Sequence, residues 1–226
     1  MKERLTVLCG EIEPCDTFAD VGCDHGFCME YALRHGLCRY GIAADISEHA
    51  LRTAERRLAR FVNQGRCRLV VCDGLAAIPK DVDLVMIAGM GGDLICRILD
   101  KDFIPRRMIL QPMTDARAVR EYLLCHGCRI IRDKVFAADR IYDLISAERA
   151  SEADSYSERE LEFGRDNLRT YNPAFCAKLE KLMELQREYI KKSPKESVSE
   201  SLRQRLLYLE EIYDGIRNGN IGDTRK

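Results

Sequence analysis

From the start of the chain to about residue 148, short apolar runs alternate with stretches of helical periodicity. This alternation predicts a mostly parallel sheet with helices on both faces. The last two runs leave no room for a crossover helix between them, so we expect them to pair antiparallel at one edge. The predicted fold is therefore α/β, a Rossmann-like doubly wound sheet. The predicted strands are Thr17–Val21, Tyr40–Asp45, Cys67–Cys72, Val82–Ala88, Arg107–Gln111, Arg129–Val135 and Ile141–Ala147.

The pattern changes after Ala150. Residues 151–172 are polar, and two stretches follow in which apolar residues recur at three- and four-residue steps. Lys192–Lys195 separates these stretches, and Pro194 is well placed to begin the second helix. We therefore expect a catalytic domain at 1–150 and an antiparallel helical hairpin within 151–226, with a disordered tail at Asn218–Lys226.

Composition narrows the class of protein. The 226 residues carry a formal net charge of −1, so contacts with nucleic acid would have to come from local basic patches. Neither a signal peptide nor an apolar run long enough to span a bilayer is recognisable, and we expect a cytoplasmic protein without membrane contact.

The eleven cysteines do not indicate a disulfide framework or a metal site. Their number is odd, their spacing is irregular, and several lie in apolar runs where cysteine acts as a small hydrophobe. The C-x-x-C sequence at Cys125–Cys128 lacks a second pair at zinc-site spacing, so we interpret it as a helix end followed by a turn.

The most informative motif is the glycine-rich turn at Asp20–Gly26, which follows the first predicted strand. Such a turn brings backbone close to a nucleotide cofactor. Asp24 stands where this turn usually carries a second glycine, and its charge would repel a pyrophosphate at the helix N-terminus. The turn therefore favours S-adenosylmethionine, whose sulfonium is positive, over a nicotinamide dinucleotide.

Three further strand ends carry candidate chemistry. Asp45, followed by Ile46, is placed to accept hydrogen bonds from two ribose hydroxyls. At Asp73-Gly74 the acid is placed to accept from an adenine amine, with the glycine giving clearance. The Ala88–Gly92 segment would line a flat pocket with backbone. A lone acid after a strand is more often a helix cap than a ligand contact, and we expect Asp93 to cap or enter the next helix.

These motifs resemble those of the bacterial tRNA (adenine(22)-N(1))-methyltransferase family. The resemblance rests on Asp20–Gly26, on Ile87–Gly92 and on Leu110–Pro112. It implies a class I methyltransferase domain with a helical, coiled-coil-like C-terminal domain, S-adenosylmethionine as cofactor, and N1 of a tRNA adenine as methyl acceptor. Met113 stands where the family typically has asparagine, and Asp143 where a glutamate is common.

The motifs and the resemblance together assign the site residues. The catalytic group is Asp24, Met90 and Gly91. The cofactor group is Asp20, Gly22, Cys23, His25, Gly26, Asp45, Ile46, Asp73, Gly74, Ala88 and Gly89. The substrate group is Gly92, Gln111, Pro112, Arg57 and Arg60. No metal ligands are assigned.

Adenine N1 already carries a lone pair, so methyl transfer to it needs alignment rather than a strong base. We expect Asp24 to accept from the adenine N6 amine as the ring becomes cationic, with a plain cofactor contact as the alternative. His25 is either a turn residue or a substrate contact.

The expected tRNA partner has two candidate contact regions. Arg52, Arg56, Arg57 and Arg60 share one helix face, and Lys191, Lys192 and Lys195 lie at the hairpin tip. Either group is equally typical of a solvated face. Two rival functions stay open, namely a methyltransferase with another substrate and a non-catalytic interaction module. We expect a monomer or a weak dimer.

Overall fold

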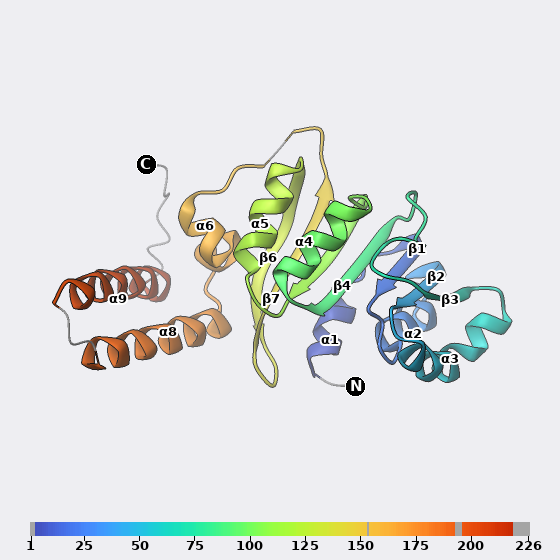
Figure 1. Cartoon of the computed structure of the whole chain (residues 1–226), viewed down its shortest axis with the longest axis horizontal. Helices are drawn as coiled ribbons and strands as arrows, with labels where there is room; N and C mark the ends of the chain where they lie inside the picture. Colours follow the sequence, from blue (N-terminus) through green and yellow to red (C-terminus); the bar gives the residue numbers. More distant parts are fainter. Residues whose placement is uncertain (1–2, 153, 193–195, 219–226) are drawn as a thin grey trace.

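The computed structural model describes residues 3–152, 154–192 and 196–218, with side chains from 200 onward in the last segment. A seven-stranded sheet runs through the molecule in the order β3-β2-β1-β4-β5-β7-β6, and helices lie on both of its faces (Figure 1). The strands are β1 (Cys15–Val21), β2 (Cys38–Asp45), β3 (Cys67–Val71), β4 (Leu84–Met90), β5 (Arg107–Pro112), β6 (Cys128–Ala137) and β7 (Ile141–Arg149).

Two helical layers cover the sheet. Apolar residues of α1 (Glu3–Gly10), α2 (Phe27–Arg34) and α3 (Glu48–Asn63) form one core with one face of the sheet. Those of α4 (Gly92–Lys101) and α5 (Ala116–Cys125) form a second core on the opposite face. Alternation along β1 explains the division, because Phe18 packs into the first core and Ala19 into the second.

The sheet confirms the predicted α/β class. Each of the seven apolar runs contains a strand, and β1 to β5 are parallel where they pair. The last two strands pair antiparallel at one edge, as expected, with β7 between β5 and the outermost strand β6. The strand predicted at Val82–Ala88 is displaced: β4 begins at Leu84 and continues to Met90.

The C-terminal part is helical, in α6 (Glu158–Phe163), α7 (Arg165–Arg169), α8 (Pro173–Lys192) and α9 (Glu196–Arg217). The polar segment 151–172 thus contains two short helices that the sequence pattern did not predict. Arg187 pairs with Glu210 at 2.8 Å, and Tyr213 hydrogen bonds Glu180, so α8 and α9 run antiparallel as a hairpin beyond the β6 end of the sheet (Figure 1). Pro194 and the tail from residue 219 lie outside the described residues.

A buried ionic cluster joins the hairpin to the sheet. Arg120 of α5 is fully buried and lies 2.9 Å from Asp133 of β6 and 3.1 Å from Asp143 of β7. Lys178 of α8 pairs with the second oxygen of Asp143 at 2.7 Å. The Arg120 guanidinium also donates to the carbonyls of Leu161 and Glu162. It lies on the side of Gly164 where another residue would carry its Cβ. Asp143, a departure from the resembled family, therefore has a structural role in this joint.

Candidate functional site

The order of the strands places the switch point of the sheet beside β1, where folds of this type have their binding crevice. The chain moves from β1 outward through β2 to β3 and then returns to β4 on the other side of β1. In open sheets of this kind, ligands bind at the carboxyl ends of the strands where the direction reverses. All four strand ends selected from the sequence lie at this edge, because β1 to β4 are parallel.

The Asp20–Gly26 turn is anchored to the end of β2. The amides of Gly22 and Cys23 both donate to the carbonyl of Ala44, at 2.8 and 3.0 Å. The amide of Asp24 donates to Oδ2 of Asp45 at 3.1 Å. Asp45 therefore serves the turn directly, as well as standing at the end of its own strand.

Asp24 presents its carboxylate to solvent. Its backbone is left-handed, at φ 48°, a conformation that aspartate tolerates better than most residues. The side chain is 73% exposed, and Oδ1 lies 3.7 Å from Nε2 of His25, which is 50% exposed. Both groups are therefore accessible to a ligand in the crevice.

Arg57, assigned to the substrate, instead supports the turn. Its Nε donates to the carbonyl of His25 at 3.0 Å, and Nη1 pairs with Glu30 at 2.8 Å. Its guanidinium carbon lies 3.6 Å from the centre of the Phe27 ring. These contacts already use the charge and the planar face of the side chain. Gly26 likewise has a packing role, because a Cβ there would lie 3.1 Å from Leu58 of α3.

Asp20 is buried beneath the turn. Burial raises the pKa of its carboxyl from 3.8 to about 7, against a lowering effect from its hydrogen bond to the Met29 amide. Burial also raises the pKa of the neighbouring Cys23 thiol, so this cysteine is neutral and unreactive. These two residues shape the turn from below and are not exposed to a ligand as Asp24 is.

The end of β2 combines a carboxylate with an exposed apolar side chain. Oδ1 of Asp45 accepts from the Ser47 amide at 2.9 Å, and each oxygen retains acceptor capacity for a further donor. Ile46 is 71% exposed. A carboxylate beside an exposed apolar surface suits a nucleoside, whose ribose has hydroxyl donors and whose base has an apolar face.

Asp73 and Gly74 lie at the adjacent strand end. Asp73 pairs with Lys101 at 2.8 Å, and both side chains are mostly exposed. Gly74 has a positive φ, and a Cβ there would lie 3.1 Å from Ile98 of α4. The absence of a Cβ at Gly74 therefore lets the turn pack closely against α4.

The residues that join the end of β4 to the start of α4, called here the Gly89–Gly92 loop, lie on the other side of β1. A Cβ on Gly22 would overlap the methyl end of Met90, so the two selected motifs are in direct contact. Gly91 is the N-cap of α4, and Asp93 lies in the first turn of that helix, as expected. A Cβ on Gly92 would overlap the Asp115 carbonyl oxygen.

The residues after β5 complete this wall. The Met113 amide donates to the carbonyl of Met90 at 2.7 Å, and the Gly92 amide donates to Thr114 at 2.9 Å. Pro112 is buried, and Gln111, which pairs in register with Ala88, is fully buried. Gln111 therefore supports the loop from behind rather than facing a substrate.

Sequence reasoning missed Arg4. This residue of α1 donates from Nη1 to Oε1 of Gln111 at 2.6 Å. An arginine near the chain start carries no local pattern that points to a partner 107 positions away, so only the folded arrangement reveals the contact.

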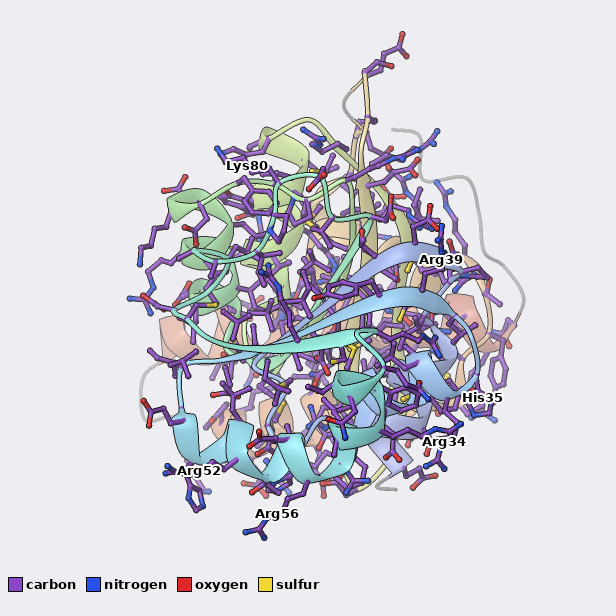
Figure 2. All side chains as sticks on the ribbon, turned by 90° about the vertical axis from the view of Figure 1, so that its right-hand side faces the viewer. Arg34, His35, Arg39, Arg52, Arg56 and Lys80 are labelled. Carbon is purple, nitrogen blue, oxygen red and sulfur yellow. The ribbon has the colours of Figure 1, made fainter. Side chains whose placement is uncertain are left out.

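The candidate RNA contacts lie on separate surfaces. Arg52 and Arg56 project outward from α3 (Figure 2), and Arg52 lies 4.0 Å from Glu48. Lys191 and Lys192 are exposed at the end of α8, while Lys195 lies outside the described residues. Arg60 is on α3 and lies near the Phe61 ring.

The cysteines are free thiols. Cys125 ends α5 and Cys128 begins β6, with a left-handed glycine between them at Gly127, which confirms the interpretation of this C-x-x-C as a helix end and turn. Within the described part of the chain, no group of three potential metal ligands comes together. No helix of that part is long and apolar enough to cross a membrane.

Comparisons with known proteins agree with this arrangement. The family model of tRNA (adenine(22)-N(1))-methyltransferases matches residues 18–214. The tRNA (adenine(22)-N(1))-methyltransferase of Bacillus subtilis is 30% identical over 162 residues, which cover 69% of this chain and 68% of that protein.

Solved structures show the same fold over nearly the whole chain. The structure of the B. subtilis m1A22 tRNA methyltransferase TrmK superposes with a TM-score of 0.81 at 26% identity, covering 95% of this chain and 99% of that one. The M. capricolum TrmK structure, a complex with S-adenosyl-homocysteine, gives a TM-score of 0.84 at 22% identity, covering 96% and 99%. With its sheet order, its turn motifs and a family match that spans both the sheet and the C-terminal hairpin, the chain belongs to the tRNA (adenine(22)-N(1))-methyltransferase family.

Proposed function

We propose that this protein transfers a methyl group from S-adenosylmethionine to N1 of adenine 22 in tRNA. One observation carries the proposal: in a chain of this family, the turn after β1, Asp45 and the Gly89–Gly92 loop come together at one edge of the sheet. The anchored turn and Asp45 form one wall, and the glycine loop with Pro112 forms the other.

The crevice fits the cofactor chemically. Asp45 would hold the ribose hydroxyls, Ile46 would cover the adenine face, and the backbone at Gly22 would lie against the methionine part. S-adenosylmethionine, when bound, supplies an electrophilic methyl group on a positively charged sulfur. The carboxylates of Asp24 and Asp45 at this edge favour a cation and disfavour a pyrophosphate.

The protein's own task is to orient the base. The target adenine must leave its base stack, at a cost of about a few kcal/mol. It must then be held so that N1, the methyl group and the sulfur lie in line. The Gly89–Gly92 loop, without bulky side chains apart from Met90, offers a flat surface for the ring. Asp24 would accept from the N6 amine, whose acidity rises as the ring becomes cationic, and so stabilise charge in the transition state.

Contacts with the rest of the tRNA would come from basic side chains outside the crevice. Arg56 and Arg60 on α3 and Lys191 and Lys192 on α8 are the candidates for phosphate contacts. A tRNA substrate would place the protein in the cytoplasm. We further propose that the protein is a monomer or a weak dimer, to be measured by sedimentation.

The deciding experiment incubates the purified protein with unmodified tRNA and labelled S-adenosylmethionine, followed by nucleoside mass mapping. We expect 1-methyladenosine at position 22, and no label in a transcript with guanosine at that position. Methylation at another nucleotide, or of protein but not RNA, would overturn the substrate assignment. Failure to bind the cofactor in calorimetry would instead favour a non-catalytic interaction module.

A further inference from the structure

The first helix reaches the wall of the crevice through Arg4. Its guanidinium hydrogen bonds Gln111 near the end of β5, with Nη1 2.6 Å from Oε1. It also packs against the side of Gly89 that lacks a side chain, where an added Cβ would lie 3.2 Å from Nη1. One side chain therefore contacts the ends of both β4 and β5.

The contact with Arg4 orients the buried side-chain amide of Gln111. A guanidinium has donors only, so the amide oxygen must face it and Nε2 must face the opposite direction. There Nε2 donates to the carbonyl of Pro112 at 2.9 Å and lies 3.6 Å from Sδ of Met113. Without Arg4, the buried oxygen loses its donor, and only the Pro112 carbonyl still orients the amide.

The Pro112–Met113 segment is in turn bonded to the glycine loop. The Met113 amide donates to the Met90 carbonyl at 2.7 Å. A continuous set of hydrogen bonds thus runs from Arg4 through Gln111 to the residues that would face the target base. Local displacements in such a wall alter the alignment of the reacting atoms.

Arg4 does not act as one half of an ion pair. Over the described residues, the ion pairs do not include it. Its guanidinium carbon instead lies 5.7 Å from the centre of the Tyr142 ring, whose hydroxyl donates to Asp139. Neutral groups hold this cation, so its position depends on Gln111 and Tyr142.

We propose that Arg4 is a positioning residue that, through Gln111, sets the Pro112–Met113 wall of the methyl-transfer site. This inference rests on the proposed function. Arg4 lies behind the wall, so its removal should impair turnover while leaving the Asp45 side of the cofactor site intact.

The test compares Arg4→Met, Arg4→Lys, Gln111→Met and the Arg4→Met/Gln111→Met double variant. We expect Arg4→Met to lower kcat for tRNA methylation at least tenfold while the cofactor Kd changes less than twofold. Arg4→Lys keeps a donor and should restore most of kcat. In the Gln111→Met background, Arg4→Met should have little further effect, because the group through which it acts is already absent.

Three results would overturn the proposal: an Arg4→Met effect of equal size in both backgrounds, a rise in cofactor Kd that matches the loss of activity, or unchanged kcat with only a lower Tm. If the unaltered protein binds cofactor but does not methylate tRNA, the proposed function fails by itself. The side-chain amide signals of Gln111, assigned by their absence in Gln111→Met, then test the positioning role: they should shift in Arg4→Met, and unchanged signals refute it.

Discussion

Two aspartates of one turn have opposite surroundings. Asp20 is buried, and burial raises the pKa of its carboxyl to about 7, whereas the Asp24 side chain is 73% exposed at the mouth of the crevice. A sequence motif presents both simply as acids beside glycines. Only Asp24 is placed to touch a bound base, which separates a shaping role from a chemical one.

Replacing Asp24 with asparagine removes the charge and retains a residue that tolerates its left-handed backbone. We expect kcat for tRNA methylation to fall by about a hundredfold, because the negative charge that would stabilise the developing positive charge is lost. The cofactor Kd, measured by calorimetry, should stay within a factor of two. Asp16→Asn, at an exposed acid in β1 away from the crevice, is the control. Equal losses in kcat and cofactor affinity would make Asp24 a cofactor ligand.

Asp20 gives stability a pH dependence of predictable sign. The pKa of this carboxyl is about 7 in the folded protein and 3.8 in the unfolded chain. Between pH 3.8 and pH 7, the folded state therefore binds more protons than the unfolded state. Its contribution is therefore complete below pH 4 and is lost as the pH rises through 7. The free energy of urea unfolding, compared with that of Asp20→Asn, should decline by about 2 kcal/mol between pH 5 and pH 7. Parallel pH profiles for the two proteins would contradict this expectation.

At the scale of elements, the glycine loop depends on close contact with the segment that follows β5. A Cβ on Gly92 would overlap the Asp115 carbonyl and lie 2.8 Å from that of Thr114, both backbone atoms that cannot rotate away. Gly92→Ala should therefore destabilise the fold by about 1–3 kcal/mol and abolish methylation. Thermal unfolding measures the first effect and labelled-methyl incorporation the second. Gly10→Ala, where nothing lies within 4 Å, should leave both unchanged, and a Gly92→Ala protein that behaves likewise would refute the close packing.

The sequence located strands well where an apolar run is followed directly by polar or glycine residues. The runs ending at Val21 and Asp45 are strands, and their ends lie together at one edge of the sheet. For single residues, the structure adds contacts that sequence spacing does not reveal. Arg57, Gly26 and Gly74 have packing contacts that explain them without a ligand, because sequence spacing does not show the direction in which a glycine's open face or an arginine's charge points.

At the scale of the molecule, the Arg120 cluster joins the sheet to the C-terminal hairpin. Arg120→Met would leave Asp133 buried without its cation, which should cost about 3–5 kcal/mol in the free energy of unfolding. It should also weaken the attachment of α8, measured as faster amide exchange in that helix. Arg117→Met removes an exposed arginine from the same helix and should have little effect. Similar losses in both variants would show that the buried cluster is not the joint.

The amino-acid sequence alone determined the strands, the turn motifs and the family to which the protein belongs. Hydrophobic periodicity and turn residues act between near neighbours in the chain, so they can be recognised without the tertiary structure. Tertiary structure alone decided that β7 enters the sheet before β6 and that Asp20 is buried while Asp24 is exposed. It also decided that Arg4 meets Gln111. Those outcomes depend on which distant surfaces pack together, and that is a property of the whole core rather than of any one segment.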